Sequence, residues 1–182
     1  MAIDREKFYT LYKQYVYESL TELIQTQAEN TFGNGGKAWK YISGLVTKGV
    51  RSYVYAVYKP RVYQRRSKSG GLGDPNNVVI NVGECVIDDG GGEISFEITN
   101  TTPPGLGGEG GYIADDVIAG TGYKYAKYDR EHRYAVPRDF YQTYYEQYDS
   151  DKTGNMILQS IRGKLQNIVN QAFEKAWAAS SK

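Results

Sequence analysis

The chain has little of what enzymes and secreted domains usually depend on. Its 182 residues include one cysteine, Cys85, and one histidine, His132. A single cysteine excludes an internal disulfide, which fits assembly in the cytosol. One cysteine and one histidine make no credible zinc cluster. The first residues lack the apolar core of a signal peptide. No run approaches the roughly 18 apolar residues that would span a membrane.

Three sequence patterns resemble catalytic or ligand-binding motifs, and each lacks an essential part. Gly105–Gly110 matches G-x-G-x-x-G, but two prolines precede it and no βα units follow. Asp149–Ser160 begins like a calcium loop, but Ser160 stands where the bidentate glutamate belongs, so a linker that caps the last helix fits better. Cys85 falls in a predicted strand, where a buried thiol is the default, although a dyad with His132 stays open. We expect no enzyme, no cofactor and no metal site.

The charges, in contrast, are strongly segregated along the chain. Lys37–Lys68 holds nine lysines and arginines and no acidic residue, whereas Asp74–Asp116 holds nine acidic residues and no basic one. The net charge is only +1, so opposite signs lie on separate segments. Such a chain can attract copies of itself or a charged partner. Its eighteen tyrosines suit surfaces that are wet before assembly and covered after it.

The two charged segments meet at Tyr58–Asn77, which reads YKPRVYQRRSKSGGLGDPNN. Its cations, interleaved with tyrosines, could contact the phosphates and bases of a nucleic acid. They could equally dock on the acidic segment of another copy, or form a solvated loop. A net charge near zero argues against a dedicated nucleic-acid-binding protein.

The helical signals lie at the two ends of the chain. Asp4 is a plausible N-cap for a helix over 5–29, and the cluster TFGNGG at 31–36 breaks that helix. A second helix fits 37–58, with a strand as the alternative over 53–58. Further helices are predicted by the apolar spacing at 112–119, 138–148 and 155–178.

The strand signals lie in the middle. The segments 78–88 and 93–101 read as two strands, joined by a turn at 89–92. The segments 103–111 and 120–136 read as irregular. The fold class is therefore α+β, with N- and C-terminal helices packed on a small, mainly antiparallel sheet and a long protruding basic loop.

We expect one domain over residues 1–182. Its parts, in chain order, are 1–58 helical, 59–77 basic loop or arm, 78–101 β-hairpin, 102–136 irregular and 137–182 helical.

Three segments in fixed order carry a family resemblance. They are the basic stretch Tyr58–Asn77 after an amphipathic helix, YIADDVIAGTG at Tyr112–Gly122, and VPRDF at Val136–Phe140 before the terminal helices. Together they resemble the tail-completion or head–tail joining proteins of long-tailed bacteriophages. The resemblance spans about 37–178. It departs from the family pattern at Ala119 and Asp139 and in the long loop 103–111.

The resemblance implies a non-enzymatic virion protein of the phage neck or tail end, made in the bacterial host cytoplasm. It implies a small ring of copies, commonly a hexamer, that joins the portal or head-closure proteins to the tail tube or tail terminator. Double-stranded DNA would pass through its lumen. A nucleic-acid-binding module that uses 58–68 is the alternative. The residues that we expect at the interface are Tyr58, Arg61, Tyr63, Arg65, Arg66, Lys68, Leu72, Asp74, Asp115, Asp116, Arg138 and Phe140.

Overall fold

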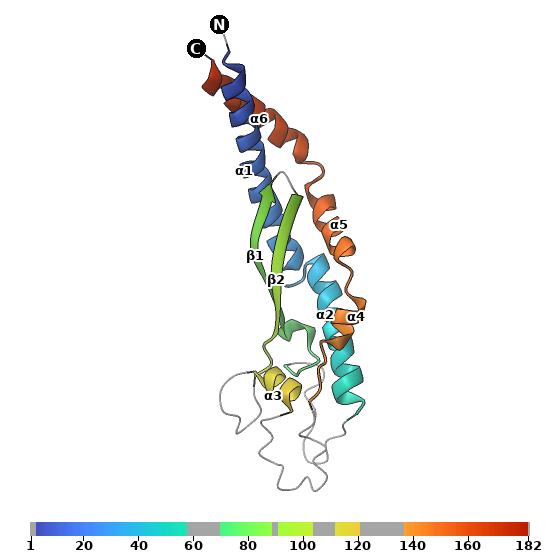
Figure 1. The fold of residues 1–182 in the computed structure, drawn as a ribbon. Helices are drawn as coiled ribbons and strands as arrows, with labels where there is room; N and C mark the ends of the chain where they lie inside the picture. The colour runs from blue at the N-terminus through green and yellow to red at the C-terminus, as the bar shows by residue number, and fades with distance from the viewer. Residues whose placement is uncertain (1–2, 58–69, 89–90, 104–111, 121–136, 182) are drawn as a thin grey trace. The chain divides into compact units, whose positions relative to one another are not determined.

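The computed structural model describes residues 3–57, 70–88, 91–103, 112–120 and 137–181. These residues form an α+β fold that is mostly helical and has one two-stranded antiparallel sheet (Figure 1), so the predicted fold class is confirmed. Two compact units can be recognised from their internal contacts. Unit 1 is Met1–Gly33, Asn81–Glu97 and Asp151–Lys182, and unit 2 is Asn34–Ile80 and Ile98–Ser150. The expectation of a single domain over 1–182 stays a prediction.

Helix α1, Arg5–Phe32, opens unit 1 at the predicted cap. The Asp4 carboxylate accepts a hydrogen bond from the Lys7 N–H at 3.1 Å, which satisfies one of the donors left free at a helix start. The helix runs three residues further than predicted and ends at Gly33, whose N–H donates to the Glu29 carbonyl at 2.8 Å.

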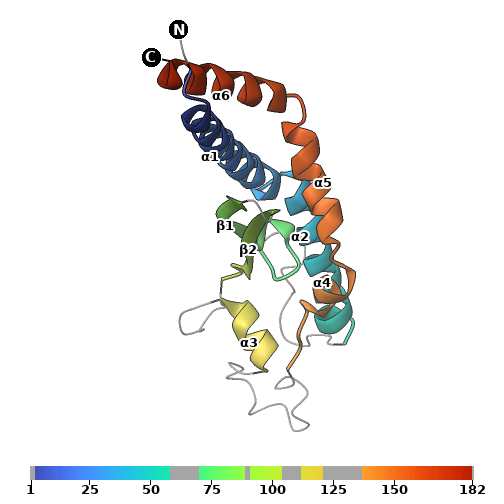
Figure 2. The same cartoon turned by 45° about the horizontal axis from the view of Figure 1, so that its top comes forward.

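Helix α6, Leu165–Ser180, lies against α1 (Figures 1 and 2). Its fully buried residues are small, namely Ala172, Ala176 and Ser180, and small side chains let two helix backbones approach closely. The chain ends meet beside this contact, because Ile3 and Ser181 form an antiparallel bridge.

The predicted C-terminal helix over 155–178 is wrong as one element. The chain forms α5, Ser150–Ile161, and then α6. The break falls at Gly163, a poor helix former, where the Lys164 N–H turns back to the Ile161 carbonyl at 2.8 Å. Helix α5 also replaces the predicted linker at 149–160 and its calcium-loop alternative, because its buried residues Thr153, Ile157 and Ile161 recur every four residues along one face.

The two predicted strands are confirmed as β1, Val78–Asp88, and β2, Gly91–Asn100. In β2, the half-buried residues Ile94, Phe96 and Ile98 alternate with exposed neighbours, as expected when one face is covered. Gly91 and Gly92, which we placed in the turn, belong to β2. The other two turn residues, 89–90, lie outside the described residues.

Unit 2 begins with α2, Lys37–Gly49, which continues into the π-helical turn η1, Val50–Tyr55. The strand alternative over 53–58 is therefore wrong for residues 53–55. Ala38, Ile42, Val46 and Val50 are fully buried along one face, as the apolar spacing predicted. Tyr53, within η1, and Val57, beyond it, are 37% and 70% exposed, since the chain no longer has the α-helical period from Val50 onward.

The rest of unit 2 includes the short turn η2, Pro75–Asn77, and the helices α3, Ile113–Ala119, and α4, Gln142–Gln147. Helix α3 is confirmed and ends at Gly120, whose φ of 69° lies in the left-handed region that glycine adopts readily.

Helix α4 starts later than the predicted residue 138. The backbone N–H of Arg138 donates to the Val117 carbonyl at 3.1 Å, and the Asp139 carboxylate accepts from the Tyr141 N–H at 2.9 Å. Both bonds hold residues 138–141 in a non-helical turn. No helix in the described part of the chain is long and apolar enough to cross a membrane.

Candidate assembly surface

Six of the predicted interface residues, Tyr58, Arg61, Tyr63, Arg65, Arg66 and Lys68, lie outside the described residues. We call residues 58–69 the basic segment. It contains five lysines and arginines and no acidic residue. What the structure does describe is the base on either side, where η1 leads into the segment and residues 70–77 follow it.

A hydrogen bond joins the two sides of this base. The Gly73 N–H donates to the Tyr55 hydroxyl at 3.0 Å. The backbone at Gly73 also packs on the Tyr55 ring, because an added Cβ would lie 2.9 Å from Cε2 of that ring. The residues on the two sides of the basic segment are therefore joined at one place, and Tyr55 is a residue whose role sequence reasoning missed.

Asp74, a predicted interface residue, closes the turn that follows the basic segment. Its side chain is only 6% exposed. The two carboxylate oxygens accept hydrogen bonds from the Gly70 N–H at 2.6 Å and the Asn76 N–H at 2.9 Å. These two bonds, the Gly70 bond first, hold the pKa of Asp74 below its ordinary value, because both stabilise the charged form. Asp74 thus fixes its own turn.

Two side-chain amides, Asn100 of β2 and Asn77 of η2, fix the same turn. The Asn100 side chain is 1% exposed and donates to the Leu72 carbonyl at 3.0 Å, while its oxygen accepts from the Thr102 hydroxyl at 2.5 Å. The Asn77 side chain donates to the Gly71 carbonyl at 2.9 Å and to the Thr102 hydroxyl at 3.1 Å. Sequence reasoning missed Asn100 and Thr102, and the only signal was polar residues at the end of a strand.

Three further predicted interface residues are buried inside unit 2. Leu72 is 6% exposed, Arg138 is 8% exposed and Phe140 is fully buried. The Phe140 backbone packs against α2 at Gly49, so closely that an added Cβ on that glycine would collide with the Phe140 carbonyl. All three residues are thus buried in the single chain, and their interface role stays a prediction.

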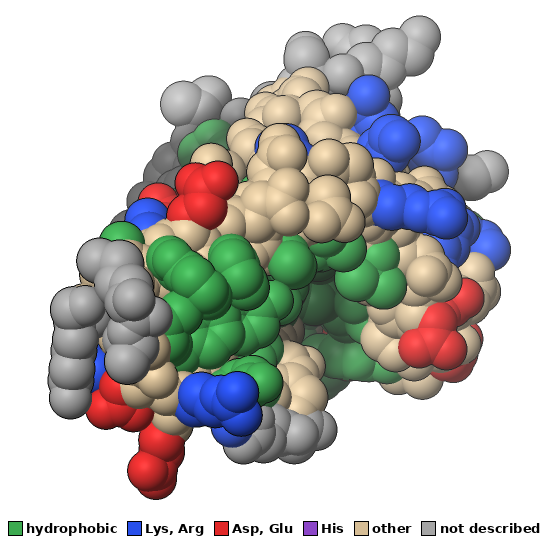
Figure 3. Space-filling model, turned by 90° about the horizontal axis from the view of Figure 1, so that it is seen from above, with side chains coloured by type: hydrophobic (Ala, Val, Ile, Leu, Met, Phe, Trp, Pro, Cys, Tyr) green, Lys and Arg blue, Asp and Glu red, His purple; other side chains and the backbone are tan. Residues whose placement is uncertain are grey.

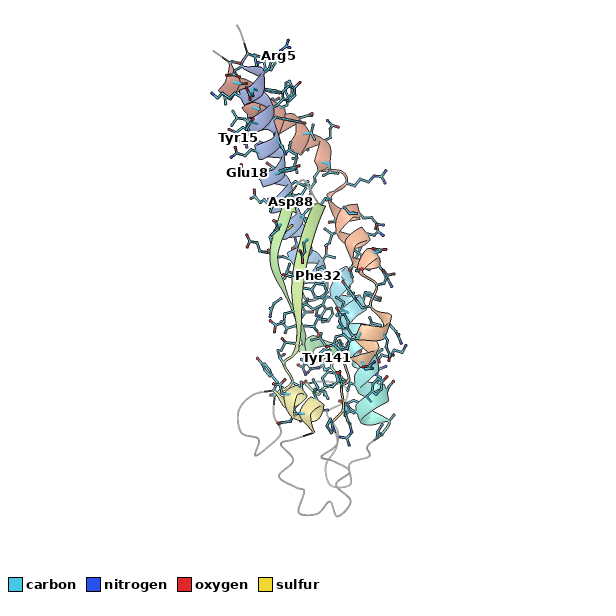
Figure 4. The ribbon with its side chains drawn as sticks, viewed as in Figure 1. Arg5, Tyr15, Glu18, Phe32, Asp88 and Tyr141 are labelled. Atoms are coloured by element: carbon cyan, nitrogen blue, oxygen red, sulfur yellow. The ribbon has the colours of Figure 1, made fainter. Side chains whose placement is uncertain are left out.

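The last two predicted residues lie in the first turn of α3. Asp115 is exposed and Asp116 is partly exposed. Tyr141, which Figure 4 labels, has its pKa raised to about 12, chiefly by burial and also by the negative charges of Asp115 and Asp139. The negative charge of Asp115 therefore acts on Tyr141, the residue after Phe140.

A second exposed surface, on unit 1, was missed. Leu165, Val169, Phe173 and Trp177 recur every four residues along α6 and are between 38% and 49% exposed. Phe173 and Trp177 contact the Phe8 ring of α1, with centroids 5.3 and 6.2 Å apart. Figure 3, which looks down from the end where the termini lie, shows hydrophobic side chains gathered over this region. The apolar spacing over 155–178 predicted a helix but not this exposure, because the periodicity of an apolar stripe does not reveal whether another element covers it.

Among the described residues, no group of three or more histidine, cysteine, aspartate or glutamate side chains could hold a metal ion. The buried Cys85 thiol has its pKa raised by burial, which disfavours the reactive thiolate. His132 lies outside the described residues, as do Gly105–Gly110. The features that the structure does describe are hydrogen-bonded turns in unit 2 and an exposed apolar surface on α6.

The comparisons with known proteins give one result. Neither the curated proteins nor the solved structures contain a match to this chain. The model of the YomN family matches residues 16–167, which covers α1 from residue 16 onward and the hydrogen-bonded turn around Asp74. The chain therefore belongs to the YomN family, a phage-derived family of the Bacillus prophage type.

Proposed function

We propose that this chain is a structural virion protein of the phage neck or tail end, where copies form a ring that joins head to tail and lets DNA pass. Membership of a phage-derived family supports a role in a phage. The observation that carries the proposal is the clamped base of the basic segment. The basic segment, 58–69, has twelve residues and five cations. A hydrogen bond between Tyr55 and Gly73 joins the residues that flank it.

A clamped base suits a contact between subunits. The Asp74 carboxylate and the Asn100 amide fix the residues that follow the basic segment through hydrogen bonds. A fixed base reduces the conformational entropy that is lost when the segment binds. Opposite charges on separate segments allow one face of a copy to complement a different face of the next. Such heterologous contacts generate rings when the rotation between copies closes.

The proposal gives the protein no catalytic role. Its partners would be further copies of itself, the portal or head-closure proteins, and the tail tube or terminator. DNA would be a passing neighbour in the lumen. The place of action would be the virion, after synthesis in the host cytoplasm.

The test is a phage that encodes Arg65→Glu together with Arg66→Glu. We expect the variant protein to fold, as circular dichroism would show, but tailed particles to fall at least about tenfold because the contact is repelled. The matched control is Lys40→Glu with Arg51→Glu, which reverses two exposed cations of α2 and η1 and should leave assembly unchanged. Normal yields of tailed particles from the Arg65/Arg66 variant, or absence of the protein from purified virions, would contradict the proposal.

DNA binding separates this function from the alternative. The isolated protein should bind double-stranded DNA weakly at physiological salt. Tight binding that falls steeply as salt is raised would indicate release of counterions from neutralised phosphates. In that case the nucleic-acid-binding alternative would replace the ring.

A further inference from the structure

A groove of about 790 Å³ runs between α1 and β1 within unit 1. Its apolar lining comes from Tyr17 on α1 and from Val82 and Ile87 on β1. Figure 4 labels Glu18 on α1 and Asp88 at the end of β1, the two elements that bound it. All its lining residues belong to unit 1, whereas the turn around Asp74 belongs to unit 2.

The Gln25 side chain fixes the spacing of the two walls. Its amide nitrogen donates to the Gly83 carbonyl at 3.1 Å, and its oxygen accepts from the Cys85 N–H at 2.8 Å. These are the contacts that a neighbouring strand would make to the edge of β1. The groove is therefore preformed, because a pair of hydrogen bonds holds the helix against the strand edge.

The charged residues that line the groove are all acidic. Glu18, Glu22 and Glu84 are exposed and belong to its lining, which includes no lysine or arginine. Glu18 and Glu22 lie one helical turn apart, so both carboxylates project from one side of α1. Lys13 lies over the Tyr17 ring at 5.6 Å, beside the first lining residue of α1. An extended segment with several cations and some apolar side chains would match this groove in both charge and hydrophobicity.

We propose that the α1–β1 groove binds the basic segment, residues 58–69, of a second copy of this chain. The segment YKPRVYQRRSKS contains five cations together with Tyr58, Val62 and Tyr63, so it offers positive charge to the carboxylates of the groove and apolar side chains to Tyr17, Val82 and Ile87. The inference rests on the proposed function and names its subunit contact. The groove belongs to unit 1 and the clamped base to unit 2, so the contact joins unlike surfaces, as a ring requires.

The direct test places a photo-crosslinking amino acid, p-benzoylphenylalanine, at Thr21 in the groove lining of the full chain. Equal amounts of unlabelled and ¹⁵N-labelled protein are mixed before irradiation, and mass spectrometry identifies the crosslinked peptides. We expect mixed-isotope crosslinks to residues 58–69. Crosslinks to 58–69 only within one chain, crosslinks elsewhere, or a chain that stays monomeric at every concentration would each overturn the proposal.

Charge reversal gives the second test. We expect Glu18→Lys with Glu22→Lys to weaken self-association at least about tenfold in sedimentation velocity, and Arg65→Glu with Arg66→Glu to do the same. Combining all four changes should restore association, because the pairs are re-formed with opposite signs. The control Glu93→Lys with Glu97→Lys reverses two exposed acids of β2 outside the groove and should change association by less than about twofold.

The two proposals fail in different ways. If association is unaffected by both reversals while the Arg65/Arg66 variant still blocks particle assembly, the groove is overturned and the neck role stands. If the groove crosslink forms but the protein is absent from virions, the contact stands and the neck role is overturned.

Discussion

The hydroxyl of Tyr55 and the backbone N–H of Gly73 lie 3.0 Å apart and form a hydrogen bond. Eighteen positions separate the two residues, and the whole basic segment lies between them. The bond thereby sets the width of the base from which the segment starts.

We expect Tyr55→Phe to lower the free energy of unfolding of unit 2 by about 1 kcal/mol, because the Gly73 N–H loses its acceptor. Native-state hydrogen exchange should show the Gly73 amide exchanging several-fold faster. Tyr53→Phe is the control, since Tyr53 lies on the same turn but is 37% exposed. Equal exchange at Gly73 in the two variants would contradict a role for the Tyr55 hydroxyl.

Two glycines of α2 should respond to alanine in opposite directions. Gly49→Ala places a Cβ against the Phe140 carbonyl, and overpacking of this kind costs about 1–3 kcal/mol. Gly44 has nothing within 4 Å of an added Cβ, so Gly44→Ala should stabilise the helix by about 0.5–1 kcal/mol. Thermal melts of both variants check the prediction, and a higher melting temperature for Gly49→Ala would refute the close contact with Phe140.

Asp74 should make unit 2 sensitive to acid. Its folded pKa lies below the ordinary value of 3.8, so its contribution to stability is present above that pH and is lost as the pH falls through the folded pKa. We expect Asp74→Asn to cost about 1–3 kcal/mol at pH 7, because one oxygen that accepts from a backbone N–H is replaced by an NH₂ donor.

The difference in the free energy of unfolding between wild type and Asp74→Asn should shrink as the pH falls below 3.8. Urea titrations at several pH values measure it. Asp115→Asn, which changes an exposed acid of the same unit, is the control and should show a small difference. A constant gap between wild type and Asp74→Asn down to the acid transition would be inconsistent with the bonds from Gly70 and Asn76.

The alkylation rate of the Cys85 thiol should show whether α1 is held against β1 at the wall of the groove. Its thiol is 3% exposed and its pKa is raised by burial, so alkylation of the native protein at pH 8 should be at least tenfold slower than in denaturant. Gln25→Ala removes the acceptor of the Cys85 N–H and the donor to Gly83, and should speed the reaction as the strand edge loosens. Gln14→Ala, on the same helix and bonded only to Glu18 among the contacts described, should leave the rate unchanged. Identical alkylation rates for the Gln25 and Gln14 variants would contradict the role of the Gln25 side chain in holding α1 against β1.

Local signals in the sequence explain which parts of this fold were predictable. Asp4 caps α1 through an atom three residues away, and the alternation of Ile94, Phe96 and Ile98 follows from the geometry of a single strand. The division between α5 and α6 was missed because both helices keep an apolar period, and one glycine, Gly163, interrupts them.

The hydrogen bonds around the Asp74 turn were harder to predict from the sequence, because their partners come from distant parts of the chain. Asn100 meets Leu72 across 28 positions, and Asn77 meets Thr102 across 25. No periodicity connects such pairs. The burial of Leu72, Asp74 and Phe140 was missed for the same reason, and their predicted role at an interface stays a prediction.

The bridge between Ile3 and Ser181 also has a consequence for biosynthesis. Unit 1 draws on residues 1–33, 81–97 and 151–182, whereas unit 2 uses only 34–80 and 98–150. During translation, all residues of unit 2 are present once residue 150 has been made, but α1 must wait for α6. Until then the aromatic rings of Phe8 and Tyr12 have no Phe173 to pack on, so the emerging N-terminal helix exposes apolar surface that favours aggregation.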